Sequence, residues 1–334
     1  MKKYKMLFVS TMMLGTMITI SSYSWMGMWM GLEINLISII PLLNNMDMYS
    51  AEASIKYFIT QALASAILMF AVIIFSTSKE MLTLYLNKTT VMLINSSLLT
   101  KMGAAPFHFW FPEVMEGLSW VNCFIMLTWQ KIAPMIMLMY NSSMTLFMSV
   151  VIILSMLVSG IMGFNQISMR KIMTYSSINH IGWMIGAMIY SQAVWSIYFI
   201  IYTIITANIL IVLNKFKVFF LKQMILMQIN PMTKMILILN FFSLGGLPPF
   251  LGFMPKWFTI QALVEKTQLI LPFTMIILTL MTLFFYMRIV FSSLVLSQNN
   301  ILPSKTKTKK FWMLTSNIMA LSGMLAFPLF FNFI

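Results

Sequence analysis

The stretch WVNCFIMLTWQKIAPMIMLMY, Trp120–Tyr140, is long and apolar enough to cross a membrane, and it carries one charge, Lys131, near its middle. A helix needs about 20 apolar residues to cross the hydrocarbon core of a bilayer. A lysine at the centre of such a helix costs roughly 2.5 kcal/mol or more, so a charge that persists there points to a function. This stretch therefore predicts a membrane protein with buried ionisable side chains.

The composition of the whole chain indicates the same class. Hydrophobic residues make up 60% of the 334 residues and charged residues only 8%, whereas a soluble domain carries about 25% charged residues. The net charge is +14, but the basic residues lie in short connections between apolar runs. They form no basic stripe interleaved with aromatic residues, which a nucleic-acid-binding protein would need. We therefore expect lipid as the main solvent and no nucleic acid as a partner.

About eleven runs of membrane-crossing length follow one another along the chain. They cover residues 6–24, 25–43, 54–76, 90–112, 120–140, 144–166, 173–190, 194–214, 234–262, 269–291 and 312–333. The first run, after the basic N-terminus, could pass for a signal peptide, but it continues almost directly into the second without a small-residue cleavage pattern. We interpret it as an anchoring helix, and the sequence predicts an all-α membrane protein with no water-soluble domain between its spans.

The charges in the connections predict an orientation. The loops on the side of the N-terminus are rich in basic residues: Arg170, Lys171, Lys215, Lys217, Lys222, Lys305, Lys307, Lys309 and Lys310. The loops on the opposite side hold few charges: Lys79, Glu80, Lys88, Glu265 and Lys266. Because basic loops stay on the cytoplasmic or matrix side, we expect the N-terminus there. An odd number of spans then places the C-terminus on the opposite side.

Two segments of the chain match each other without a gap. Residues 103–113 read GAAPFHFWFPE and residues 246–256 read GLPPFLGFMPK. The predicted spans that contain them run in opposite directions, which is the signature of an inverted repeat in transporters. Gly and Pro break a helix, and broken backbone is tolerated at membrane depth only where protein or a water-filled cavity satisfies it. Gly and Pro are common in single membrane helices, but two matching segments favour a transporter core with two broken helices.

Five ionisable residues in or beside these spans are candidates for proton transfer: Glu33, Lys101, Lys131, Lys256 and His180. Burial disfavours the charged form of a lysine and a nearby carboxylate favours it, so a lysine between these influences can exchange a proton. One acid among several lysines suits a proton relay better than a metal site, which needs clustered carboxylates or imidazoles. The alternative is that these charges form buried structural pairs, and His180 can equally be a satisfied interior histidine.

The sequence also lacks the features of several other functions. Its single cysteine, Cys123, excludes an intramolecular disulfide framework, and we expect it to be a small buried residue. His108 lies beside the first break, and we expect a local role for it. The sequence has no Gly-rich phosphate loop, haem-ligand pair or iron–sulfur cysteine set. We therefore expect no metal or cofactor bound by this chain.

Five motifs resemble the subunit 2 family of mitochondrial NADH:ubiquinone oxidoreductase, respiratory complex I, in an insect-like or other invertebrate style. They are GLEINL at 31–36, LLTKMGAAPFHFWFPEVMEGL at 98–118, LTWQKIAP at 127–134, MRKIMTYSSINHIGW at 169–183 and SLGGLPPFLGFMPKW at 243–257. The resemblance spans nearly the whole chain and weakens only after about residue 295. It implies an antiporter-like fold of two inverted five-helix repeats, residues 1–142 and 143–295. Residues 296–334 would then form a basic loop and a C-terminal membrane helix.

The resemblance also implies roles for individual residues. The central glutamate of the family falls on Glu33, its first broken-helix lysine on Lys101, and the next lysine on Lys131. The lysine of the second broken helix falls on Lys256, and the histidine of the SSINH segment falls on His180. Some antiporter-like relatives carry a glutamate at the proton exit where this chain has Lys256. The exit path assigned to those relatives therefore does not transfer to this chain.

The activity implied by the resemblance is proton translocation, driven by NADH oxidation and ubiquinone reduction in other subunits. NADH, FMN, the iron–sulfur clusters and ubiquinone would be held there, and the partners of this chain would be other complex I subunits and lipids. The location would be the mitochondrial inner membrane, with the N-terminus in the matrix and the C-terminus in the intermembrane space. Two alternatives stay open: a free-standing cation/proton antiporter, although no second intramembrane carboxylate is present to help form a sodium or potassium site, and a purely structural connector.

Overall fold

The structure, a computed structural model, describes residues 3–44, 47–77, 84–226 and 231–295. Within these ranges the regular secondary structure is helical, apart from one isolated β-bridge between Ser168 and Phe220, and short turns and connections join the helices. The helices are α1 Lys3–Ser21, α2 Trp25–Leu43, α3 Met48–Thr77, α4 Leu84–Met102, α5 Trp110–Gly117, α6 Trp120–Leu127, α7 Trp129–Tyr140, α8 Thr145–Phe164, α9 Met169–Tyr190, α10 Gln192–Phe216, α11 Leu221–Leu226, α12 Pro231–Gly245, α13 Phe253–Glu265 and α14 Ile270–Val295. The all-α prediction is confirmed for this part of the chain.

Among the described residues, seven helical segments are long and apolar enough to cross a membrane. They are Tyr4–Ser21, Trp25–Leu43, Met48–Ser76, Trp120–Tyr140, Thr145–Phe164, Gln192–Phe216 and Ile270–Phe291. Each coincides with a predicted run. The runs 90–112 and 234–262 are divided by breaks, the run 173–190 lies in the more polar α9, and the run 312–333 lies outside the described residues. The total of eleven crossings therefore stays a prediction.

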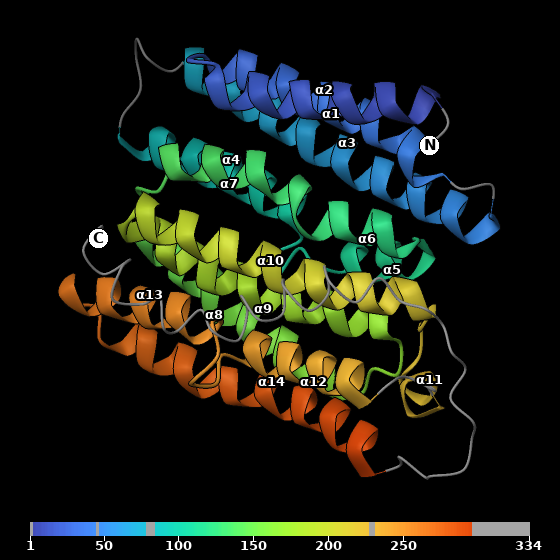
Figure 1. Ribbon diagram of the computed structural model, residues 1–334. Coiled ribbons are helices and arrows are strands. Elements are labelled where there is room, and N and C mark those ends of the chain that lie inside the picture. The colour runs from blue at the N-terminus through green and yellow to red at the C-terminus, as the bar shows by residue number, and fades with distance from the viewer. Residues whose placement is uncertain (1–2, 45–46, 78–83, 227–230, 296–334) are drawn as a thin grey trace. The chain divides into compact units, whose positions relative to one another are not determined.

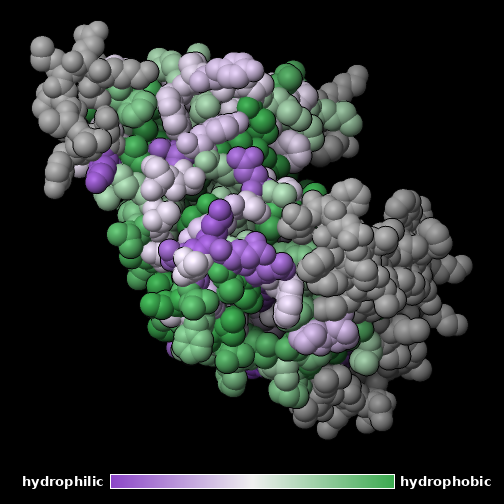
Figure 2. Space-filling model, turned by 90° about the vertical axis from the view of Figure 1, so that its left-hand side faces the viewer, coloured by the Kyte–Doolittle hydropathy of each residue, from purple (hydrophilic) through white to green (hydrophobic). Residues whose placement is uncertain are grey.

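Helix α3 carries a stripe of apolar side chains on its exposed face. Ile55, Ile59, Leu63, Ile67 and Phe70 recur at helical spacing, and all are exposed. A stripe of this length would be a liability on a soluble monomer, but it suits a helix that faces lipid or a neighbouring protein. Figure 2 shows hydrophobic surface over much of one face of the molecule, with the hydrophilic residues gathered in patches.

Helix α9 shows the opposite pattern, because polar side chains lie at its most buried positions. All of its residues from 172 to 188 are buried. Thr174, Ser176, Ser177, Asn179 and His180 are each at most 5% exposed. Buried polar groups are costly unless they are hydrogen-bonded, so a helix of this kind marks an internal polar path or a functional site.

The chain divides into two compact units, Met1–Leu154 and Ser155–Ile334. In the first unit α2 packs against α1 and α3, α4 packs against α3 and α7, and α5 packs against α3 (Figure 1). In the second unit α10 packs against α9, α12 and α13, and α14 packs against α12. The boundary between the units falls inside α8, and the repeat boundary after residue 142 stays a prediction.

Candidate functional site

The first broken helix is interrupted between α4 and α5. Gly103 has a φ of +73°, a backbone region that favours glycine, and the peptide bond between Ala105 and Pro106 is cis. The Gly103 N–H donates to the Thr100 carbonyl at 3.1 Å, and the Ala104 N–H donates to the Leu99 carbonyl at 3.1 Å. These bonds close the C-terminus of α4 as a left-handed glycine cap does. The helix therefore ends where the sequence predicts a break.

The second broken helix, between α12 and α13, has the same local backbone. Gly246 has a φ of +75°, and the peptide bond between Pro248 and Pro249 is cis. The Gly246 N–H donates to the Phe242 carbonyl at 3.1 Å, and the Leu247 N–H donates to the same carbonyl at 3.4 Å. The two segments that match in sequence thus also match in conformation, and both predicted breaks are present.

A further interruption, which the sequence did not indicate, divides the predicted span Trp120–Tyr140 into α6 and α7. Thr128 lies between them with φ −117° and ψ −72°. Its hydroxyl donates to the Phe124 carbonyl at 2.7 Å, a side-chain bond that bends helices. Within α7, Pro134 has no N–H to donate to the Gln130 carbonyl four residues before it. The predicted span over 120–140 is present as a segment of membrane-crossing length, but it is interrupted just before Lys131.

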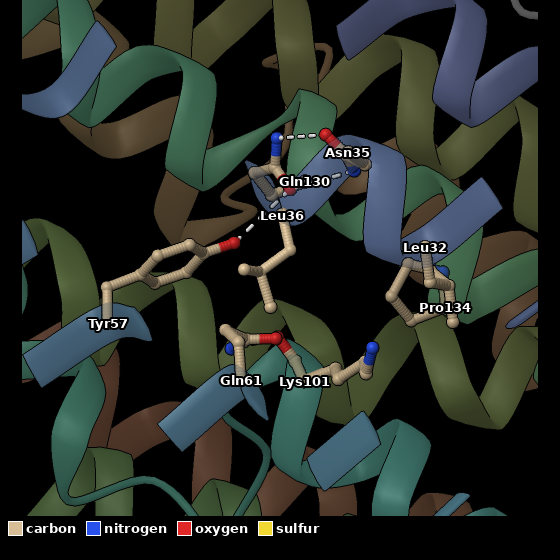
Figure 3. A pocket seen from close by; sticks show the side chains of 8 residues that line it. All are labelled: Leu32, Asn35, Leu36, Tyr57, Gln61, Lys101, Gln130 and Pro134. Atoms are coloured by element: carbon tan, nitrogen blue, oxygen red, sulfur yellow. Dashed lines mark hydrogen bonds between the residues drawn. The ribbon is translucent and has the colours of Figure 1, made fainter. Parts of the chain in front are cut away.

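Lys101 lies in the last turn of α4 and is 7% exposed. A cation is favoured there, because the C-terminal end of a helix carries a partial negative charge. Its side chain borders a small cavity that is lined by Leu32, Asn35, Leu36, Tyr57, Gln61, Lys101, Gln130 and Pro134 (Figure 3). The Gln61 side chain donates to the Lys101 carbonyl at 3.3 Å.

Glu33 lies on α2 and faces away from this cavity. It is half-buried, and its Oε1 atom has no hydrogen-bond partner among the residues that the structure describes. It borders an open groove between α2 and α3, together with Trp29, Ser65 and Phe70. Glu33 interacts favourably with the Lys101 ammonium by charge, but the two residues form no direct ion pair in the described part of the chain.

Lys131 lies in the first turn of α7 and is 1% exposed. Its Nζ atom lies 5.7 Å from the centroid of the Phe111 ring, which belongs to α5. An aromatic face attracts a cation at this distance. The side chain is thus held beside the second half of the first broken helix, and it is buried within the protein.

Lys256 lies in the first turn of α13 and is 6% exposed. Its Nζ atom donates to the carbonyl of Gly245 at 2.7 Å and lies 5.7 Å from the centroid of the Trp183 ring. A Cβ atom on Gly246 would lie 2.8 Å from Nζ and Cδ of this lysine. The lysine side chain therefore turns back across the break and packs against the glycine.

His180 lies on the buried face of α9, 5% exposed. Its Nδ1 atom is 2.8 Å from the Tyr198 hydroxyl, and its ring centroid is 5.0 Å from that of Tyr202. Both tyrosines come from α10. The interior of the second unit therefore pairs an imidazole with one phenol by a hydrogen bond and with a second phenol by ring contact, and a proton can lie on either side of the His180–Tyr198 bond.

The structure brings Glu33, Lys101 and Lys131 into the first unit and places Lys256 and His180 in the second. Sequence reasoning weighed only charged residues and histidines, and it missed the neutral polar groups around them. In the first unit these are Asn35, Tyr57, Gln61 and Gln130; in the second they are Tyr198 and Tyr202. The sequence did contain a signal for the amides, because Asn35, Gln61 and Gln130 lie in apolar runs and an amide side chain is itself costly in lipid.

Three further sequence expectations concern metal ligands, Cys123 and His108. No group of three or more His, Cys, Asp or Glu side chains that could hold a metal is found among the described residues. Cys123 is buried, and its Sγ atom lies 3.8 Å from the carbonyls of Met115 and Leu118. His108 is buried, and its Nδ1 atom lies 3.3 Å from the Pro106 carbonyl, within the first break.

Comparison with known proteins places these features in one family. Residues 22–282 match the model of the family described as NADH:quinone oxidoreductase/Mrp antiporter, TM. NADH-ubiquinone oxidoreductase chain 2 of Anopheles gambiae is 48% identical over 98% of this chain and 94% of its own length. The chain 2 protein of Dasypus novemcinctus is 40% identical over 94% of this chain and 94% of its own length.

Solved structures share the fold. A chain of respiratory complex I from Thermus thermophilus superposes with a TM-score of 0.87 at 21% identity, covering 97% of this chain and 78% of its own length. A chain of the Mrp complex from Dietzia superposes with a TM-score of 0.79 at 14% identity, covering 96% of this chain and 75% of its own length. The chain is a multi-pass membrane protein with the antiporter-like fold, and it belongs to the family of NADH-ubiquinone oxidoreductase chain 2.

Proposed function

We propose that this chain translocates protons as an antiporter-like subunit in the membrane arm of respiratory complex I. One observation carries the proposal: within the described part of the chain, each of the three buried lysines lies at an interruption of a helix. Lys101 is in the last turn of α4, Lys131 in the first turn of α7, and Lys256 in the first turn of α13. Interrupted backbone at membrane depth belongs beside protein or water-filled cavities, and buried charges in membrane proteins mark ion and proton paths.

In this proposal Lys101 and Lys131 carry the proton along the middle of the membrane. Glu33 acts on Lys101 by charge, so that a change at Glu33 alters how strongly Lys101 holds its proton. Lys256 links to the far half-channel, and His180 helps to hydrate the path. The buried side chains, the polar cavity at Lys101 and the contact between His180 and Tyr198 support these roles.

The setting follows from the family. We propose that the chain lies in the mitochondrial inner membrane, with its N-terminus in the matrix and its C-terminus in the intermembrane space, among other complex I subunits and lipids. Residues 1–142 and 143–295 would form the inverted repeats. NADH oxidation and ubiquinone reduction, with FMN and the iron–sulfur clusters, would take place in other subunits, and this chain would hold no redox centre.

Two measurements test the proposal. On a native gel of detergent-solubilised membranes stained for NADH dehydrogenase activity, we expect mass spectrometry to find this chain in the large active band. Migration as a small independent species would instead favour a free-standing cation/proton antiporter.

In membranes with the assembled complex, Lys101→Met should lower proton pumping, while Lys222→Met, which alters an exposed lysine, should leave it unchanged. Unchanged pumping in Lys101→Met would contradict the relay.

A further inference from the structure

The cavity beside Lys101 contains a side-chain arrangement that the proposed relay does not yet use. Asn35 donates to Gln130 Oε1 at 3.0 Å, and Gln130 donates back to Asn35 Oδ1 at 3.1 Å. The Tyr57 hydroxyl donates to the same Gln130 oxygen at 3.4 Å. We call this group of Asn35, Gln130 and Tyr57 the amide clamp. Figure 3 shows the clamp on one side of the open centre of the cavity, with the Lys101 side chain on the other side.

We propose that the amide clamp binds and orients one water molecule against the Lys101 ammonium, and that Asn35, Gln130 and Tyr57 are therefore positioning residues for proton transfer at Lys101. This inference rests on the proposed function, because it gives Lys101 its hydrogen-bond partner in the relay. It adds a bound ligand, water, and gives a role to three uncharged residues, of which Asn35 and Gln130 lie within the quoted motifs at 31–36 and 127–134.

The size of the cavity fits this ligand. The space open to the centre of a water molecule is about 10 Å³, close to the volume that one water needs by the same measure. A buried water also needs two to four polar partners. The polar lining comes from four helices: Asn35 of α2, Tyr57 and Gln61 of α3, Lys101 of α4 and Gln130 of α7.

The hydrogen-bond capacity of the lining fits as well. An ammonium has three N–H donors, and Lys101 Nζ donates to no protein acceptor among the described residues. Within the clamp, Gln130 Oε1 already accepts two bonds, while Asn35 Oδ1 accepts one and each amide nitrogen uses one of its two N–H groups. One water can therefore accept from both Lys101 and the second N–H group of Asn35, and both donors gain the acceptor that burial otherwise denies them.

The clamp also connects the other residues of the relay. Asn35 follows Glu33 on α2 by two positions, and Gln130 directly precedes Lys131 on α7. The reciprocal amide bonds thus tie the helix of Glu33 to the helix of Lys131 across the cavity of Lys101. A shift of either helix alters the clamp, and with it the water that contacts Lys101.

A purely structural role is the competing explanation, because a buried amide pair also holds two helices together. The chain offers a matched control: Asn141 donates to Asn95 Oδ1 at 3.1 Å, and Asn95 donates to the Asn141 carbonyl at 3.2 Å. Asn95 is fully buried in the same unit but does not line the cavity. Loss of this pair reports on packing alone.

The test compares Gln130→Met, Gln130→Glu, Asn95→Leu and Lys101→Met in membranes that contain the assembled complex. Proton pumping is measured per assembled complex across a range of pH, beside NADH oxidation. Gln130→Met keeps the length of the side chain but removes its hydrogen bonds. We expect it to lower pumping by about tenfold, the rate equivalent of one lost hydrogen bond, and to change its pH profile. Gln130→Glu keeps the acceptor oxygen but places a carboxylate in the cavity of Lys101, so it should move the pH profile of pumping to higher pH. Asn95→Leu should change only the amount of complex.

The outcomes separate this inference from the proposed function. If Gln130→Met pumps with the wild-type rate and pH profile while Lys101→Met does not, the clamp is structural and the relay stands. If Lys101→Met also pumps normally, the proposed function itself fails. If Gln130→Met does not assemble, Tyr57→Phe removes only the hydroxyl of the clamp, and an unchanged pH profile in that variant overturns the inference.

Discussion

The Nζ atom of Lys256 donates a hydrogen bond of 2.7 Å to the carbonyl oxygen of Gly245, the last residue of α12. Lys101 lies in the last turn of α4. Both lysines thus place a cation at the C-terminal end of the first half of a broken helix, where the helix dipole is negative. They do not occupy matching positions, because Lys101 precedes Gly103 in the aligned segments while Lys256 follows Gly246. Lys101 reaches the negative end of its helix as a residue of that helix. Lys256 reaches the corresponding end of α12 from α13, by a side chain that turns back across the break.

Gly246→Ala should disturb Lys256 without changing any charge. The φ of +75° at this position costs an alanine about 1–2 kcal/mol, and the new Cβ would meet Lys256 Nζ at 2.8 Å. We expect a complex that is less stable to heat and that pumps more slowly. Gly245→Ala is the control, because a Cβ there would make an ordinary contact of 3.6 Å with Tyr286. Equal behaviour of the two variants would show that the packing of Lys256 against Gly246 is unimportant.

Lys131→Met should separate function from stability. Removing a buried charge relieves a desolvation cost, so assembly of the complex should be nearly unchanged. Pumping should fall by about tenfold or more, because proton transfer by a positioned side chain contributes roughly 10²–10⁴-fold. Measuring proton flux in vesicles beside the amount of assembled complex tests both statements. Normal pumping would remove Lys131 from the relay, and lost assembly with normal pumping per complex would favour a structural connector.

Tyr198→Phe should reveal whether the contact with His180 matters. The substitution removes one hydroxyl, which lies 2.8 Å from His180 Nδ1, and keeps the ring in place. We expect a loss of roughly 1 kcal/mol in stability and a few-fold decrease in pumping. Tyr140→Phe alters an exposed tyrosine and serves as the control. If both variants pump like the wild type, the role of His180 in hydrating the path does not depend on Tyr198.

Much of the architecture could be predicted from the sequence, because lipid imposes strict rules on length and on backbone satisfaction. The two breaks are encoded by Gly103 and Gly246 with the prolines that follow them, and the structure interrupts both helices there. The interruption at Thr128 was missed, since threonine is common within helices. It depends on a hydroxyl that bonds backward to Phe124, a choice between local conformations that the sequence does not reveal.

The candidate site was predicted in its charges but not in its neutral polar groups. Lys101, Lys131 and Lys256 are buried within the protein, and their depth in the membrane stays a prediction. The partnership of Asn35 with Gln130 joins residues 95 positions apart, and it depends on how α2 and α7 pack. The sequence does not show which residue an amide side chain will pair with. A charge within a membrane span, by contrast, indicates a function because placing it there costs so much free energy.

Chemical labelling should reveal the orientation of the chain in the membrane. Lys217 and Lys222 are exposed in a basic connection that we predict to face the matrix, and Lys266 is exposed in a connection on the opposite side. In mitochondria stripped of their outer membrane, an impermeant amine reagent should modify Lys266 and spare the other two lysines. In inside-out inner-membrane vesicles the pattern should reverse, and the buried Lys131 should stay unmodified in both. Labelling of Lys222 from the outer face would invert the orientation that we infer from the loop charges.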